Sequence, residues 1–196
     1  MRILVGLGNP GRRYARTRHN VGFMAAKEFL ARHGIGRQRE EAGSLVAEAR
    51  HAGEIMLVAR PQAFMNASGP AVARICRLHG ASPEDLVLAY DDADLPLGRI
   101  RVRPSGRPAG HKGVASIAEA LGTDEIPRVR IGVGRPSGVE KGLADYVLDE
   151  FDRDEEPLAR EVIAEAVDAI EILLREGVKN AMNRYNRRRV EGPMSP

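Results

Sequence analysis

The polar loop that follows the first apolar run of the chain contains side chains suited to acid–base chemistry. Residues 6–22 read GLGNPGRRYARTRHNVG, with His19 near the end of the loop and Asn9 in an Asn-Pro-Gly turn. Imidazole exchanges protons near neutral pH, so His19 is a candidate general base. Its sequence neighbours are polar, and a buried ring would need partners for both nitrogens. Asn9, taken alone, fits equally well as an ordinary turn residue.

A base of this kind needs an acceptor on its second ring nitrogen, and an acidic turn further along the chain offers one. Three carboxylates stand in the DDAD sequence after the apolar run LVLAY: Asp91, Asp92 and Asp94. They are also consistent with a solvated turn or a Mg²⁺ site, although the turn lacks the glycine and terminal glutamate of a calcium-binding loop. The five histidines form no H-x-x-x-H or H-E-x-x-H pattern. We therefore expect no metal.

The glycines at the start of the first loop suggest a second possibility, a dinucleotide-binding loop. Gly6, Gly8 and Gly11 spell G-x-G-x-x-G directly after a strand-like run. Such a loop needs a helix that begins inside the motif, with its N-terminus facing the pyrophosphate. Residues 12–20 are too polar for a buried crossover helix, and no acidic residue ends a second strand at the required distance. A P-loop is excluded as well, because no Gly-Lys-Ser/Thr follows.

Covalent catalysis by serine or cysteine has little support in the sequence. No serine stands in a G-x-S-x-G elbow, and NASGP lacks its first glycine. Cys76, the single cysteine, lies inside an apolar helical pattern that is typical of an inert buried thiol. One cysteine makes neither an internal disulfide nor a cysteine-rich zinc site, which suits a reducing cytoplasm.

Composition and charge indicate a cytoplasmic protein with an anionic partner. The 196 residues are 43% hydrophobic and 29% charged, typical of one globular domain. No apolar stretch approaches about 18 residues and no cleavable leader is visible, so we expect no membrane contact. The net charge is only +3, but arginines cluster at 12–18, 99–107, 128–135 and 184–189. Any one cluster is consistent with a solvated surface, whereas several clusters beside loops indicate a polyanion.

Apolar periodicity predicts an alternation of strands and helices that would position these loops. Strands are expected at 2–7, 86–91, 98–104 and 127–134, with a hairpin formed by 44–50 and 54–60. Helices are expected at 21–33, 67–79, 113–121 and 154–175, with a short helix after Gly177. The alternation predicts a single-domain three-layer α/β/α fold with a mixed, mostly parallel twisted sheet flanked by helices. We expect this domain to cover 1–186 and the basic tail, 187–196, to be frayed.

Four segments, in order, resemble the bacterial-type peptidyl-tRNA hydrolase family. They are GLGNPGRRYARTRHNVGF, RPQAFMNASGPAV, DDADLPLGRIRVRPSGRPAGHKG and PRVRIGVGRP, and the similarity runs from about Arg2 to Asn186. The resemblance implies hydrolysis of the ester between a peptide and the 3′-terminal ribose of tRNA, which frees the tRNA for translation. It implies no cofactor, a monomer, and a partner surface for the acceptor stem and 3′ end of peptidyl-tRNA.

The resemblance also implies roles for particular residues. His19 becomes the general base, Asp91 its acidic partner, and Asn9 a catalytic-site amide that distinguishes N-blocked from free aminoacyl ends. Asn66 is expected to bind substrate and orient water. The other expected substrate contacts are the tRNA-contacting Tyr14, the groove residues Phe64 and Met65, and the phosphate-clamping arginines Arg103 and Arg130. Met65 is equally consistent with core packing, and either arginine with an ordinary exposed side chain.

One position departs from the family pattern. The family commonly has GHNG, whereas this chain has GHKG with Lys112 in place of the asparagine. Lysine cannot accept a hydrogen bond but can meet a phosphate or ribose oxygen, so Lys112 is kept as a substrate-binding residue, with His111 as a secondary candidate. Two alternatives stay open at this point: a non-catalytic RNA-binding protein of the same fold, and a nucleotide-dependent oxidoreductase.

Overall fold

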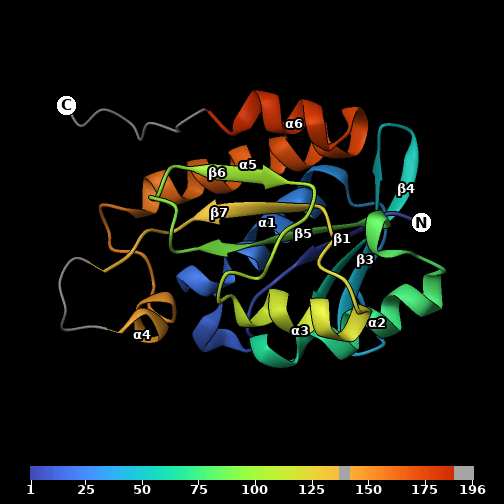
Figure 1. Ribbon diagram of the computed structural model, residues 1–196, viewed down its shortest axis with the longest axis horizontal. Helices are drawn as coiled ribbons and strands as arrows, with labels where there is room; N and C mark the ends of the chain where they lie inside the picture. The colour runs from blue at the N-terminus through green and yellow to red at the C-terminus, as the bar shows by residue number, and fades with distance from the viewer. Residues whose placement is uncertain (137–141, 188–196) are drawn as a thin grey trace.

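The fold is built on one seven-stranded sheet, seen in a computed structural model that describes residues 1–136 and 142–187 (Figure 1). The strand order is β2-β3-β4-β1-β5-β7-β6. The strands are β1 (Ile3–Gly6), β2 (Arg39–Glu41), β3 (Ser44–His51), β4 (Glu54–Pro61), β5 (Leu86–Asp92), β6 (Ile100–Arg103) and β7 (Arg128–Gly132). The central strands β4, β1, β5 and β7 are parallel, while β2, β3 and β6 pair antiparallel at the edges. The predicted mixed sheet is confirmed.

Helices cover both faces of this sheet and give the three predicted layers. On one face α1 (Val21–His33) and α5 (Glu156–Glu176) pack on the sheet together with α6 (Val178–Tyr185). On the other face lie α2 (Ser68–His79) and α3 (Lys112–Leu121) (Figure 1). The apolar stripe of α5 is buried, as its helical spacing predicted. The buried residues divide into two apolar clusters, one on each side of the central strands.

The crossing between β1 and α1 is unusually close, and two glycines make it possible. A Cβ on Gly22 would lie 2.2 Å from the carbonyl oxygen of Ala89 and 2.6 Å from that of Leu7. A Cβ on Gly6 would lie 2.3 Å from the Gly22 oxygen. The glycines of the opening loop therefore serve packing of helix on strand, which fixes the start of α1 over the ends of β1 and β5.

Some elements lie outside the predicted pattern. Arg39–Glu41 forms the short edge strand β2, and Leu143–Val147 forms the short helix α4. Neither has a periodicity of its own, because β2 is polar and α4 is barely longer than one turn. The loop before α1 contains two 3₁₀ turns, Arg12–Tyr14 and Arg18–Asn20. Of the tail expected to be frayed, Arg187 is exposed and the rest lies outside the described residues. No helix in the described ranges has the length and apolarity needed to cross a membrane.

Candidate active site

A pocket of about 600 Å³ lies where the loops after the parallel strands meet. The loop after β1 brings Asn9 and His19, the loop after β4 brings residues 64–66, and β5 brings Asp91 at its own end. Ligand sites in open α/β sheets form at such carboxyl ends. The sequence-predicted residues that line the pocket are Asn9, Tyr14, His19, Phe64, Met65, Asn66, Asp91, Lys112 and Arg130. Arg103 is on β6, at the sheet edge, and does not line it.

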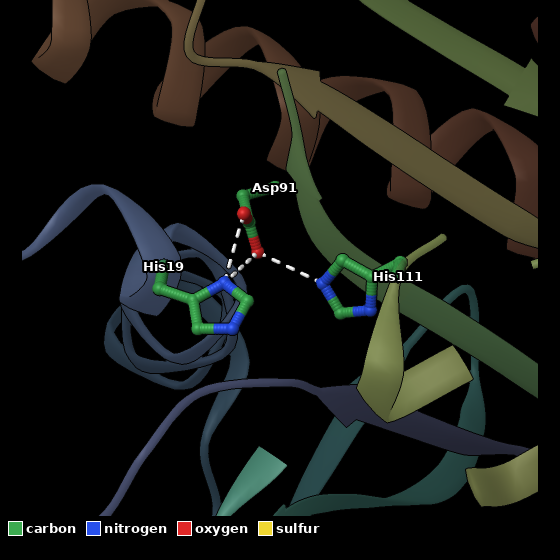
Figure 2. A group of neighbouring side chains, drawn as sticks. All are labelled: His19, Asp91 and His111. Carbon is green, nitrogen blue, oxygen red and sulfur yellow. Dashed lines mark hydrogen bonds and ion pairs between the residues drawn. The ribbon is translucent and has the colours of Figure 1, made fainter. Parts of the chain in front are cut away.

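His19 and Asp91 face each other across this pocket. The Nδ1 of His19 lies 2.8 Å from Oδ1 and 2.9 Å from Oδ2 of Asp91, which is 4% exposed. Because a carboxylate only accepts, Nδ1 carries the proton and donates, and the neutral ring keeps Nε2 unprotonated. Nε2 points away from Asp91 (Figure 2). A histidine held in this tautomer can take a proton from a group in the pocket.

His111 is a second partner of the same carboxylate. Its Nε2 donates to Oδ1 of Asp91 at 2.9 Å, and its Nδ1 accepts from the backbone amide of Val114 at 3.2 Å. The helix amide therefore fixes the tautomer of His111, which caps α3. Its ring packs on Tyr90, with centroids 4.7 Å apart. Figure 2 shows Asp91 between the two imidazoles.

The electrostatics of this group keep Asp91 ionised. Burial by itself raises the pKa of the Asp91 carboxyl, but the hydrogen bonds and electrostatic attraction of His111 and His19 outweigh burial and hold the pKa below its usual range. A permanent carboxylate at this position stabilises a proton arriving on the His19 ring. The pair can therefore work as a general base and, after protonation, as a general acid.

The same three side chains could in principle bind a metal, since their ligand atoms lie within 4.8 Å of one another. The distances favour shared protons instead. The Nδ1–Oδ1 and Nε2–Oδ1 separations are 2.8 and 2.9 Å. Two ligands of a tetrahedral zinc ion lie about 3.3 Å apart, given metal–ligand bonds of about 2.0–2.1 Å. A metal ion would need both hydrogen bonds broken and the side chains moved apart. The expectation of no metal stays a prediction.

Asn9 is held so that one end of its amide is free for a ligand. Its Oδ1 accepts from the backbone amide of Met65 at 2.8 Å, which orients the side chain unambiguously. Its backbone is hydrogen-bonded by the side chain of Asn20. The Asn20 Oδ1 accepts from the Asn9 backbone amide at 2.8 Å, and the Asn20 Nδ2 donates to the Asn9 backbone carbonyl at 2.9 Å. The Nδ2 of Asn9 has no partner among the described residues and is the group left to donate into the pocket.

Apolar side chains line the pocket in two groups that come from different parts of the chain. Phe64 is 55% exposed and meets Tyr14 edge-on, with ring centroids 6.4 Å apart. Met65 is buried yet lines the pocket, so it serves both the core and the site. The second group, here called the α4 wall, consists of Leu143, Ala144, Val147 and Leu148. Large exposed apolar groups flanking polar ones are typical of a site for an extended ligand with apolar substituents.

The charged residues around the rim are mostly paired. Arg130 Nε lies 2.5 Å from Asp92 Oδ2, and Arg135 Nη2 lies 2.5 Å from Asp94 Oδ1. Asp92 and Asp94 are therefore engaged by arginines and are not the partner of His19. The positive charge of Arg130 is likewise partly neutralised. Lys112 is exposed at the first turn of α3 and has no carboxylate partner among the described residues.

Two functional side chains had no clear signal in the sequence. Asn20 was visible only as a polar loop residue, and His111 only as a secondary candidate beside Lys112. Both act through contacts with residues distant in the chain, Asn9 and Asp91. The α4 wall had no signal of its own, since its apolar residues are too few to show a period.

Comparison with known proteins identifies a matching family model, similar relatives and similar solved structures. The family model described as peptidyl-tRNA hydrolase matches residues 3–193. The peptidyl-tRNA hydrolase of Chloroflexus aurantiacus is 45% identical over 187 residues, which are 95% of this chain and 99% of that protein. That of Syntrophomonas wolfei is 44% identical over 186 residues, 95% of this chain and all of its own length. The crystal structure of peptidyl-tRNA hydrolase from Acinetobacter baumannii superimposes with a TM-score of 0.89 at 29% identity, over 96% of each chain.

Proposed function

The chain belongs to the peptidyl-tRNA hydrolase family, and from that membership and the site we propose that it hydrolyses the ester joining a peptide to the 3′-terminal ribose of tRNA. The observation that carries the chemical proposal is the contact of His19 Nδ1 with both oxygens of the buried Asp91 carboxylate. It leaves one bare imidazole nitrogen facing a pocket with amide donors, which is what ester hydrolysis by water requires.

The reaction proceeds by general base catalysis. His19 Nε2 takes a proton from a water molecule, and the water oxygen attacks the ester carbonyl carbon. Asp91 stabilises the resulting imidazolium through Nδ1–H, and His111 keeps the carboxylate in place. When the tetrahedral intermediate collapses, the C–O bond to the ribose breaks. The imidazolium then returns its proton to the leaving 3′-oxygen, so that free tRNA and a peptide carboxylic acid result, and the acid releases its remaining proton to solvent as the carboxylate.

The amides of Asn9 and Asn66 bind the acyl side of the substrate. Asn9 Nδ2 donates to a carbonyl oxygen of the peptide, and Asn66, exposed in the same pocket, binds substrate and orients the attacking water. A free aminoacyl-tRNA presents a charged amine where an N-blocked one presents an amide. Asn9 then has no carbonyl to meet, and a mispaired polar group of this kind discriminates by orders of magnitude. Phe64, Met65 and Tyr14 pack against the peptide.

The nucleic-acid part of the substrate lies on the basic side of the pocket. Lys112 and Arg130 line the pocket, and Arg103 lies on the neighbouring edge strand β6. These residues bind phosphates of the acceptor stem and 3′ end, without a cofactor. We place the protein in the cytoplasm, where its substrate is made, and propose that it is a monomer, as the family resemblance implies.

The alternative is a non-catalytic RNA-binding protein of the same fold. It would need the basic region but not an oriented imidazole. The ordered His19–Asp91–His111 group favours the enzyme.

The decisive experiment measures release of a labelled N-acetylated amino acid from tRNA. Relative to the wild type, His19→Ala is expected to lose roughly 10²- to 10⁴-fold in kcat with tRNA binding retained, the usual contribution of a general base. His79→Ala is the matched control, because His79 contacts Glu41 outside the pocket and its loss is expected to leave kcat unchanged. Equal rates for wild type and His19→Ala would show that His19 is not the base. No release by the wild type would refute the hydrolase.

A further inference from the structure

The residue immediately before the proposed base, Arg18, is almost completely buried and holds together two segments distant in the chain. Its side chain is 3% exposed. Nη1 donates to the backbone carbonyl of Glu150 at 2.6 Å, and Nη2 to Oε2 of Glu155 at 2.5 Å. The guanidinium carbon lies 4.3 Å from the ring centroid of Tyr146 and 5.2 Å from that of Phe151.

The backbone beside Arg18 joins the same segment. The amide of Arg18 donates to the carbonyl of Asp149 at 2.9 Å, and Thr17 forms an isolated antiparallel bridge with Glu150. The 3₁₀ turn that carries His19 is thus attached to residues 146–155 by main chain and side chain together. A shift of that segment therefore moves the turn.

The attached segment is continuous with the α4 wall. Tyr146, which stacks on Arg18, sits within α4 between two wall residues, Ala144 and Val147. Its hydroxyl donates to the carbonyl of Val133 at 2.9 Å, just after β7, so the ring has a fixed position. Arg18 therefore packs on the back of the helix whose front faces the pocket.

We propose that Arg18 is a positioning residue that couples the α4 wall to the imidazole of His19, so that a peptide lying on this wall improves the alignment of the base. The inference rests on the proposed hydrolase function and concerns the acyl part of that substrate, an oligopeptide with apolar side chains. The planar guanidinium suits the role, since it stacks on aromatic rings and donates in fixed directions, which lysine does not. Small errors in the position of a base have large effects on rate.

Arg32 provides a matched control elsewhere in the chain. It is held by three carboxylates, those of Glu28, Asp168 and Glu171, and like Arg18 it joins two segments, here α1 and α5. It lies near the C-terminal end of α1, whereas Arg18 and His19 directly precede the N-terminal end of that helix. Arg32→Lys therefore removes a guanidinium that joins two segments, 29% exposed where Arg18 is 3% exposed, without touching the wall or the base.

The test compares two substrates that differ only in acyl length, an N-acetyl-aminoacyl-tRNA and the same tRNA carrying an N-acetylated tripeptide with the same C-terminal residue. Single-turnover rate constants and KM are measured for the wild type, Arg18→Lys and Arg32→Lys. We expect the tripeptide to react faster than the single residue in the wild type and in Arg32→Lys. In Arg18→Lys the tripeptide rate should fall roughly 10- to 100-fold, as for a misaligned catalytic group. In this variant the ratio of the tripeptide rate constant to the single-residue rate constant should fall toward one, while the KM for the tripeptide substrate stays nearly the same.

Several outcomes would overturn the coupling while leaving the hydrolase intact. The first is an equal rate constant for both substrates in the wild type. The second is a rate constant that falls by the same factor for both substrates in Arg18→Lys, as a merely structural role predicts. Thermal unfolding monitors the fold. If Arg18→Lys does not fold, Glu155→Gln decides the question, because it removes the nearer carboxylate partner, which is 28% exposed, and retains the guanidinium and the more distant Asp152. It should reduce the tripeptide advantage in the same direction, and an unchanged advantage in this variant refutes the proposal.

Discussion

The side-chain amide of Asn20 satisfies both backbone polar groups of Asn9. The Oδ1 of Asn20 accepts from the Asn9 amide at 2.8 Å, and its Nδ2 donates to the Asn9 carbonyl at 2.9 Å. Asn20 is 1% exposed and Asn9 7%. The two ends of the opening loop are therefore closed on each other, and the pocket amide of Asn9 is set by a residue adjacent to His19.

Removing this clamp should weaken both the fold and the site. In Asn20→Ala two buried backbone groups lose their partners, and each such loss costs about 1–3 kcal/mol. We expect the free energy of unfolding to fall by about 2–4 kcal/mol, measured by denaturant titration, together with a loss in kcat/KM on N-acetyl-aminoacyl-tRNA. Asn180→Ala, which removes an exposed side-chain contact to the Glu176 carbonyl on α6, is the control. Equal stability of the two variants would contradict the role of Asn20.

The second imidazole, His111, should matter through Asp91. His111→Ala removes the donor at 2.9 Å from the carboxylate and leaves His19 in contact with it. We expect kcat to fall about tenfold, less than for a lost base. The double variant Asp91→Asn/His111→Ala should be no slower than Asp91→Asn alone, because both changes disable one unit. Rate losses that multiply in the double variant would show that His111 acts independently.

The depressed pKa of Asp91 predicts the form of the acidic limb of the pH–rate profile. The pKa of an aspartate in an unfolded chain is about 4, and the pKa of Asp91 in the folded protein is lower. Its contribution to stability is therefore complete above about pH 4 and is lost only as the pH falls toward the folded value. Between pH 7 and 5 the carboxylate stays ionised, so its titration should add nothing to the acidic limb of log kcat/KM, and the stability difference between the wild type and Asp91→Asn should stay constant. A stability difference that shrinks within this window would mean that the carboxylate titrates there.

Lys112 should make a measurable electrostatic contribution to tRNA binding. Each phosphate neutralised on a nucleic acid contributes about 0.7 to 0.9 to the slope of log affinity against log salt concentration. Lys112→Gln should therefore lower this slope by about 0.7 to 0.9, with most of the effect in KM. Lys179→Gln removes the same charge from the exposed surface of α6 and serves as control. Identical slopes for the two variants, or an effect of Lys112→Gln confined to kcat at all salt concentrations, would assign Lys112 another role.

The close crossing of α1 over the sheet predicts a strong effect of one methyl group. In Gly22→Ala the new Cβ would lie 2.2 Å from the Ala89 oxygen, so the helix must move. Overpacking of this kind costs about 1–3 kcal/mol, and we expect the upper end of that range because the obstacle is backbone. The decrease in the free energy of unfolding relative to the wild type measures this cost. Gly36→Ala is the control, since a Cβ at that position would meet nothing within 4 Å and the change should be neutral or slightly stabilising.

The sequence by itself determined the layered fold and most of the residues of the candidate site. Apolar residues recur every two residues in a strand and about every 3.6 residues in a helix, and each repeat spans only a few neighbours in the chain. Strands and helices can therefore be predicted before any long-range contact is known. For the same reason the alternation of β and α placed the polar loops at strand ends. Short polar elements such as β2, and the small helix α4, had no period to show. They form because a neighbouring strand or a nearby loop supplies their partners.

Only the tertiary structure decided how the charged residues are paired. Adjacent residues of a strand point to opposite faces, so Asp91 and Asp92 cannot both meet His19. The register of β5 beside β7 pairs Arg130 with Tyr90, two residues before Asp92 on the same face, and Asp92 contacts Arg130 diagonally. Asp91 then lies between His19 and His111, which are far apart in the chain and meet only through the fold. Whether Arg103 and Arg130 hold a phosphate stays a prediction. A side chain's type is local, but its partner depends on which distant segment packs beside it, and that is a property of the folded chain.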